Sequence, residues 1–251
     1  MNICIYQGAN EIGGNCIEIS TQNTRILLDI GLPLISMESD APIDSYRLPI
    51  SGLYSDQVPT IDGIFISHGH PDHYGLLPLV NSEIPVYLPT AVRKTLTEIQ
   101  PFLPGEFDIS HLNIFDILPH QKIVVGDLTI TAHSVDHAPD AMAYEITDGK
   151  QRVVYTGDIR FHSSQAYKSF ALARNAKNPD YLIVEGTRLS RINDIDNENY
   201  PTEESVRDGI VRLIQDSGKL AYISMSSQNL DRLCSLISAT RRTGRTLVLD
   251  A

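Results

Sequence analysis

Short apolar runs rich in β-branched residues, separated by turn residues, fill the first part of the chain. This pattern is typical of β-strands that pack against a core. The segment 33–60 is instead polar and contains prolines, which predicts a long loop or lid. The paired glycines of EIGGNC predict the tight turn of a hairpin. The strands expected in this part cover residues 2–6, 16–19, 25–28 and 63–66.

The middle of the chain alternates between helical and extended patterns. Residues 91–102 place apolar side chains on one face at helical spacing, and residues 165–175 are also expected to be helical. A shorter helix is expected at 74–80. The strands expected around these helices cover residues 85–88, 114–117, 122–125, 128–132, 143–147, 152–156 and 181–184.

The pattern changes again after Glu185. A polar segment, 188–201, precedes a helix that starts at Thr202, whose hydroxyl is suited to capping free backbone amides. A strand at 219–224, a helix at 229–240 and a strand at 246–250 are expected next. This alternation is typical of α/β structure with a parallel sheet, so we expect one domain over 1–186 and a second over 187–251. Because the chain stops on an apolar strand, we expect it to be part of a longer protein.

Composition and charge narrow the functional classes. With 251 residues, 42% of them hydrophobic, the chain is able to bury a sizeable core, and it has no apolar run of membrane-spanning length. Three scattered cysteines and the lack of a signal-peptide pattern favour a cytoplasmic protein. The net charge of −11 argues against a nucleic-acid partner. Residues 150–191, however, hold eight basic and three acidic residues, a surplus of +5 that suits either a phosphate-bearing substrate or a solvated surface.

The stretch SHGHPDHYG contains four metal-binding groups directly after an expected strand. His68 and His70 are two residues apart, so on an extended chain both side chains point the same way and can share one ion. The proline after them ends the extension, so Asp72 and His73 face differently and suit a second ion about 3.5–4 Å from the first. Imidazole and carboxylate groups without thiolate favour Zn²⁺, with manganese or iron as alternatives. A solvated histidine-rich loop is the competing interpretation.

Two other expected strands end in further candidate ligands. The strand at 128–132 runs into HSVDHAPD, which offers His133 and His137. The strand at 152–156 runs into TGDIR, which offers Asp158. One histidine and this aspartate, as a bridge between two cations, would complete the site, but spacing alone does not choose between the two histidines.

The motif HxHxDH after a strand, followed by a later histidine and by TGD, resembles the metallo-β-lactamase superfamily of hydrolases. The resemblance implies an αββα sandwich with the metals at one edge. The stretches GANEIGGNCIEI, ILLDIGLPL and VDHAPDAMAY are similar to one branch, the ribonuclease J-like β-CASP nucleases, in which a second domain is inserted. LIVEGT resembles the start of that insertion, and SMSSQNLDRLCSL and RRTGRTLVLD resemble its first half. The resemblance covers nearly the whole chain and implies a sandwich followed by part of an α/β β-CASP-like domain.

The resemblance also implies two divalent ions and the residues that hold them. The positions that match the family's ligands are His68, His70 and His137 for one ion, and Asp72, His73 and the bridging Asp158 for the other. Asp29, in LLDIG, matches a buried aspartate that hydrogen-bonds near the site, so we expect it to support ligands and not to bind metal. The family takes a further histidine ligand from beyond the inserted domain, so we expect the complete site in a longer parent chain.

The expected activity is hydrolysis of phosphodiester bonds by a water that two metal ions activate, with Asp72 orienting that water or accepting its proton. The expected partner is single-stranded nucleic acid; RNA or DNA, and cleavage inside the strand or as an exonuclease, stay open. The segment between the expected strand at 219–224 and the expected helix at 229–240 is suited to bind a phosphate. Capping of that helix by Ser227 is an equal alternative. The residues expected to contribute to substrate binding are Arg160, Glu185, Ser226, Ser227 and Asn229.

Two other functions remain open at this point. The same metal centre could hydrolyse a small ester, thioester or lactam, which the acidic net charge favours. The chain could also be a non-catalytic subunit that binds metal and nucleic acid, although a complete set of ligands argues against this. A homo-oligomer is compatible with the sequence, and no membrane partner is expected.

Overall fold

Two β-sheets form the centre of the molecule, and their strands coincide with the apolar runs. The structure is a computed structural model that describes residues 1–39, 41–102, 107–187, 202–226 and 229–249. The first sheet has the order β1-β2-β3-β4-β5-β6, antiparallel from β1 to β3 and parallel from β3 to β6. Its strands are β1 (Asn2–Gln7), β2 (Cys16–Ser20), β3 (Arg25–Leu28), β4 (Gly63–Phe65), β5 (Pro85–Pro89) and β6 (Asn113–Ile117).

The second sheet has the order β11-β10-β9-β8-β7. Its neighbouring strands are antiparallel except for β10 and β11, which are parallel. Its strands are β7 (Lys122–Val125), β8 (Leu128–Ser134), β9 (Met142–Thr147), β10 (Arg152–Tyr155) and β11 (Tyr181–Ile183).

The space between the sheets is filled by alternate side chains of their strands. Ile26 and Leu28 of β3 belong to this inner core, together with Ile130 of β8 and Tyr144 of β9. Because successive side chains of a strand point to opposite faces, Leu27 belongs instead to the core on the outer face of the first sheet. The strand pattern therefore explains how one sheet contributes to two cores.

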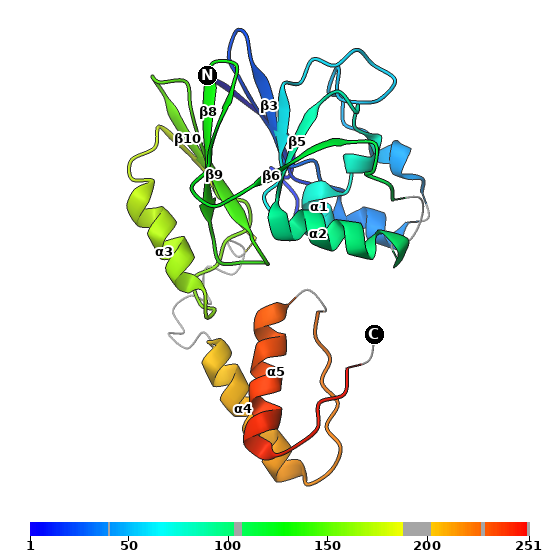
Figure 1. Cartoon of the computed structure of the whole chain (residues 1–251), viewed down its shortest axis with the longest axis vertical. Coiled ribbons are helices and arrows are strands. Elements are labelled where there is room, and N and C mark those ends of the chain that lie inside the picture. Colours follow the sequence, from blue (N-terminus) through cyan, green and yellow to red (C-terminus); the bar gives the residue numbers. More distant parts are fainter. Residues whose placement is uncertain (40, 103–106, 188–201, 227–228, 250–251) are drawn as a thin grey trace.

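Helices cover the outer faces of both sheets (Figure 1). Val92 and Leu96 of α2 (Thr90–Ile99) pack in the core of the first sheet. Leu172 of α3 (Ala166–Asn175) packs on the outer face of the second sheet. These layers confirm the expected αββα sandwich. Among the described residues, no helix combines the length and the apolar character needed to cross a membrane.

The segment 33–60, expected to be a loop or lid, is anchored on the outer core. It contains two 3-10 helices, η1 (Leu34–Glu38) and η2 (Ile43–Tyr46). Leu53 and Tyr54 are buried in the core of the first sheet. Burial of these side chains holds the segment in place, so it forms part of the outer layer.

The α-helix expected at 74–80 is not formed. The structure has a short helix α1 (Pro71–Tyr74) and then a 3-10 helix η3 (Leu77–Leu79). Pro71 occupies the start of α1, where a missing N–H costs nothing. Pro78 lacks the N–H that a continuous α-helix would need there, so the helix does not extend across it.

Two helices in the last part of the chain lie side by side (Figure 1). Their apolar side chains form a cluster of their own. These helices are α4 (Glu203–Ser217) and α5 (Leu230–Thr243). Ile214 and Leu236 are among the buried residues that hold them together, and the cluster shares no residue with the sandwich cores. We therefore propose the domain boundary at residue 187.

The strands expected at 219–224 and 246–250 are not formed in the described parts of these segments. Leu220 and Tyr222 are exposed, whereas a strand in a parallel sheet would be buried on both faces. Arg245 donates a hydrogen bond to the carbonyl oxygen of Lys219 (2.6 Å), so the two segments touch without pairing. The expectation of two strands in these segments is therefore wrong for their described residues.

Candidate metal centre

The candidate ligands come from strand ends and loops that meet at one edge of the sandwich. His68 and His70 follow β4 of the first sheet. Asp158 follows β10 of the second sheet, and His137 lies in the loop between β8 and β9. Residues far apart in the sequence are therefore brought together by the packing of the two sheets.

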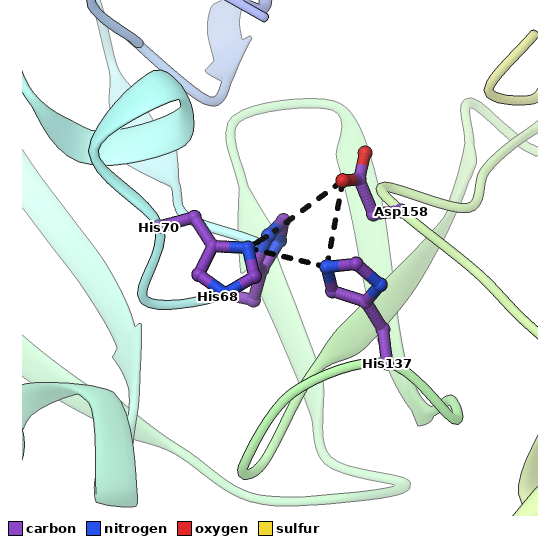
Figure 2. A group of neighbouring side chains, drawn as sticks. All are labelled: His68, His70, His137 and Asp158. Atoms are coloured by element: carbon purple, nitrogen blue, oxygen red, sulfur yellow. Dashed lines mark hydrogen bonds and ion pairs between the residues drawn. The ribbon is translucent and has the colours of Figure 1, made fainter. Parts of the chain in front are cut away.

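His68, His70, His137 and Asp158 each offer one ligand atom within 4.8 Å of the others (Figure 2). His70 Nδ1 lies 2.9 Å from His68 Nε2 and 3.2 Å from His137 Nε2. His137 Nε2 lies 3.4 Å from Asp158 Oδ2. His133, the alternative to His137, is not part of this group.

The protonation of the three histidines suits a cation between them. Burial lowers the pKa of His68 well below its ordinary value and also lowers that of His70. Burial lowers the pKa of His137 to about 4, although Asp158 acts in the opposite direction. Neutral imidazoles present lone pairs, and ring nitrogens that face one another are better satisfied by a shared cation than by mutual hydrogen bonds. Together with a carboxylate, this donor set fits a divalent ion such as Zn²⁺.

The second set of predicted ligands lies directly beside the first. His73 is fully buried, and its Nε2 atom lies 3.3 Å from Asp158 Oδ1 and 3.7 Å from Asp72 Oδ2. The other oxygen of Asp158 faces His137. Asp158 thus lies between the two sets, which is where a carboxylate that bridges two ions is needed.

The backbone after β3 holds the start of α1 in position. The Ile30 N–H donates to the carbonyl oxygen of His73 (2.9 Å), and the Leu32 N–H donates to that of Pro71 (3.1 Å). Gly31 lies between these two bonds, and a Cβ atom there would overlap a backbone carbonyl of α1. The absence of a side chain at Gly31 therefore allows the close approach that places the second set of ligands.

Asp29 is fully buried behind the candidate ligands. Its carboxylate accepts hydrogen bonds from the backbone N–H of Ser67 (2.6 Å), the Ser67 hydroxyl (2.7 Å) and the Tyr155 hydroxyl (2.5 Å). It also accepts from His73 Nδ1 (2.8 Å), which directs His73 Nε2 to the site. Burial acts to lower the pKa of His73, but the nearby carboxylates outweigh burial and raise it to about 10.

Sequence reasoning did not identify Gly13 and Asn15, both in the EIGGNC stretch, as neighbours of the site. The Asn15 side-chain amide nitrogen lies 3.0 Å from His73 Nε2, and its backbone N–H donates to the carbonyl oxygen of Asp72 (2.9 Å). A Cβ atom on Gly13 would lie 2.9 Å from Asp72 Oδ2, so this glycine is also a close-approach position. The stretch EIGGNC does connect a hairpin, but residues 8–15 form a longer loop between β1 and β2 than the expected tight turn. The contact of this loop with the candidate ligands is long-range, so no local pattern contains it.

Glu185 and Arg160 are both engaged within the protein. Glu185 Oε1 accepts a hydrogen bond from the Ile159 N–H (2.7 Å), and burial raises the pKa of Glu185. Arg160 donates to Asp136 Oδ1 (3.0 Å) and to Asp231 Oδ2 (2.8 Å). Contact of Arg160 with a substrate phosphate therefore stays a prediction, and it would compete with these two carboxylates.

The remaining predicted binding residues lie at and just before the start of α5. The Asn229 side chain caps this helix by accepting from the Arg232 N–H (3.0 Å), and the Ser226 carbonyl oxygen accepts from the Asn229 N–H (3.1 Å). Ser227 lies outside the described residues. Asn229 thus takes the capping role that was considered for Ser227.

Curated relatives of this chain include nucleases. Ribonuclease J 1 of Streptococcus pyogenes is 26% identical over 96% of this chain and 43% of its own length. The transcription termination factor FttA of Methanothermobacter thermautotrophicus is 24% identical over 94% of this chain and 39% of its own. The chain spans less than half the length of these relatives.

Structure and family comparisons agree with the architecture. A crystal structure of a protein of unknown function from Enterococcus faecalis V583 superposes with a TM-score of 0.76 at 21% identity, covering 97% of this chain and 64% of that one. It shows the same fold. The family described as "Beta-lactamase superfamily domain" matches residues 24–217, which is well over half of the chain. The chain therefore belongs to this family of beta-lactamase superfamily domains.

Proposed function

We propose that this chain carries the metal centre of a ribonuclease J-like nuclease, which hydrolyses phosphodiester bonds in single-stranded nucleic acid. The convergence of His68, His70, His137 and Asp158 carries this proposal. The alignment with a ribonuclease J over 96% of the chain supports the choice of substrate class. Cytoplasmic location and self-association, both compatible with the sequence, are part of the proposal.

Two divalent ions, Zn²⁺ or Mn²⁺, are the proposed cofactors. The four-residue group would hold one ion, and Asp72, His73 and the second oxygen of Asp158 would hold the other. When bound, such ions supply charge that offsets the transition state of phosphoryl transfer, and they lower the pKa of a water.

Asp72 is the proposed proton acceptor. Its carboxylate oxygen lies 3.7 Å from His73 Nε2. Burial raises the pKa of Asp72, and the charge of Asp158 adds to this effect, which makes its carboxylate a stronger base towards an attacking water. Asp29 holds His73 from the other side, so the ring cannot turn away while the proton moves.

The direct test is cleavage of end-labelled single-stranded RNA and DNA by the purified full-length protein with Zn²⁺ or Mn²⁺. We expect cleavage of one or both, and a loss of at least about a hundredfold in rate for Asp72→Asn. Asp216→Asn, at an exposed position on α4, is the matched control and keeps the wild-type rate. Failure to cleave either nucleic acid with any divalent ion would refute the nuclease proposal.

Two results would favour the other functions. Steady turnover of a lactam or thioester, without cleavage of nucleic acid, would assign the centre to small-molecule hydrolysis. Tight binding of metal and nucleic acid without turnover of either substrate class would assign a non-catalytic role. Elemental analysis of the double variant His68→Ala, His70→Ala tests the site itself, and unchanged metal content would contradict the ligand assignment.

A further inference from the structure

Ser67 is a buried serine between the two sheets, directly before the candidate ligand His68. Its backbone N–H donates to Asp29 Oδ1 (2.6 Å), and its carbonyl oxygen accepts from the Met142 N–H (2.9 Å). Its side chain packs against Gly157, where an added Cβ atom would lie 2.8 Å from Ser67 Cβ. Ser67, His68 and Asp29 are at most 1% exposed, so their contacts lie inside the sandwich and not on a surface that another part of the protein could cover.

The hydrogen of the Ser67 hydroxyl points to Asp29. The hydroxyl oxygen lies 2.7 Å from Asp29 Oδ2, and because an ionised carboxylate only accepts hydrogen bonds, the serine is the donor. A hydroxyl has one hydrogen and two lone pairs, so its oxygen is left to accept. His68 Nδ1 lies 3.0 Å from this oxygen, so it is His68 that donates, through a hydrogen on Nδ1.

A hydrogen on Nδ1 decides the state of the other ring nitrogen of His68. An imidazole that binds a metal ion is neutral and has a single hydrogen. With that hydrogen on Nδ1, the Nε2 atom keeps a free lone pair. Nε2 lies 2.9 Å from His70 Nδ1 and 4.0 Å from Asp158 Oδ2, so the lone pair is directed into the four-residue group (Figure 2).

We propose that Ser67 is a positioning residue, which holds His68 in the tautomer that is able to bind the ion of the four-residue group. This role rests on the proposed metal centre and extends it to the groups behind the ligands. Asp29 accepts directly from His73 Nδ1, a candidate ligand of the other ion. Through the Ser67 hydroxyl, the same carboxylate also acts on His68. One buried carboxylate thus orients a histidine in each set of candidate ligands.

The test measures the tautomer of His68 by NMR in the full-length protein without metal. Carbon-13 at histidine Cδ2 has a chemical shift that differs between the two neutral tautomers, and His68→Gln identifies the His68 signal. We expect a hydrogen on Nδ1 in the wild-type protein. Ser67→Ala removes the acceptor of Nδ1, whereas Nε2 still faces His70, so the hydrogen should move to Nε2. The Zn²⁺ affinity, measured by competition with a chelator, should then fall by about 10–100-fold.

Ser235→Ala is the matched control. Ser235 is also a buried serine whose hydroxyl donates to a carboxylate, Glu203 Oε2 (3.0 Å), but it lies on α5. This variant should keep the wild-type tautomer of His68 and the wild-type Zn²⁺ affinity. Circular dichroism checks that both alanine variants are folded.

A hydrogen on Nε2 of His68 in the wild-type protein overturns the proposed role of Ser67, whether or not the alanine variant folds. An unchanged tautomer or an unchanged Zn²⁺ affinity in folded Ser67→Ala also overturns it. Because the tautomer is measured without metal or substrate, the result is separate from nuclease activity. Cleavage of RNA or DNA by a protein with the hydrogen on Nε2 removes the role of Ser67 and leaves the nuclease proposal standing. The expected tautomer in a protein that cleaves neither supports the role of Ser67 and removes the nuclease proposal.

Discussion

At the scale of single residues, Asp29 links the fold to the site. Its carboxylate holds Ser67, at the start of the ligand stretch, Tyr155, at the end of β10, and His73. Its backbone has a positive φ of 58°, which asparagine and aspartate adopt more readily than other residues with a side chain. Asp29→Asn therefore removes the charge of the carboxylate and leaves the backbone unstrained.

Asp29→Asn is expected to weaken metal binding by about 10–100-fold, because His73 loses the partner that fixes its ring. Isothermal titration with Zn²⁺ measures the affinity, and circular dichroism checks the fold. Asp29→Ala adds backbone strain, so it should lower the melting temperature further than Asp29→Asn does. Wild-type affinity in a folded Asp29→Asn variant would show that this carboxylate does not support the ligands.

At the scale of elements, the contact between the end of β3 and α1 depends on Gly31. Gly31→Ala is expected to destabilise the protein by more than about 3 kcal/mol, because its Cβ atom would overlap a backbone carbonyl that cannot move aside without displacing Asp72. Gly209→Ala, in α4 with open space around it, is the control and should be neutral or slightly stabilising. Urea denaturation of the two variants gives the comparison, and equal stabilities would disprove the close-packing argument.

Glu18 joins the first strands of the sheet and makes stability depend on pH. It accepts from Arg25 Nη2 of β3 (2.7 Å) and from the Tyr6 hydroxyl of β1 (3.0 Å). Burial acts to raise the pKa of Glu18, but these hydrogen bonds outweigh it and lower the pKa. A lowered pKa stabilises the fold above the ordinary value of 4.5, and this stabilisation is lost as the pH falls through the lowered pKa.

Glu18→Gln should therefore cost about 1–3 kcal/mol in the free energy of unfolding at pH 7, and less as the pH falls below the ordinary pKa of Glu18. Urea denaturation at pH 7 and at pH 4 measures this difference. Glu204→Gln removes an exposed pair with Arg207 and should change stability by less than about 1 kcal/mol. A cost of Glu18→Gln that does not depend on pH would contradict the assigned linkage.

The elements also show why sequence predicted some parts and not others. The strands at 25–28 and 63–66 were predictable because their apolar pattern is local and their neighbours are present. The cap at Thr202 was also local, and its hydroxyl accepts from the Ser205 N–H as expected. The segment 219–224 has the same kind of pattern but no paired neighbour among the described residues, so it forms no strand.

The convergence of the candidate ligands could be predicted for a different reason from their surroundings. His68 and His70 are two residues apart in sequence, and this spacing predicts that their side chains lie together. Asn15 and Gly31 act through contacts with α1 that no local pattern contains, so only the folded chain reveals them. The spacing did not distinguish His133 from His137 as a candidate ligand, and it was the family resemblance that favoured His137.

At the scale of the whole molecule, Arg160 and Ser164 join the sandwich to the helical pair through Asp231. Arg160 follows the candidate ligand Asp158 by two residues, and it donates both to the buried Asp136 and to Asp231 at the start of α5. The Ser164 hydroxyl donates to the other oxygen of Asp231 (2.7 Å). Asp136 directly precedes His137 in the chain. These contacts therefore connect the segments that carry His137 and Asp158 with α5.

Asp231→Ala is expected to release α5 from the sandwich and leave the pair between Arg160 and Asp136 in place, because Asn229 still caps the helix. Hydrogen exchange should then become faster in α5 and in the segment 160–166, while the strands of the sandwich keep their protection. Asp208→Ala, which removes an ion pair with Arg242 between α4 and α5, is the control and should not change exchange at 160–166. If Asp231→Ala leaves exchange at 160–166 unchanged, the link through Arg160 does not hold the two parts together. If exchange increases and Zn²⁺ affinity also falls, the helical pair stabilises the metal centre through the same arginine.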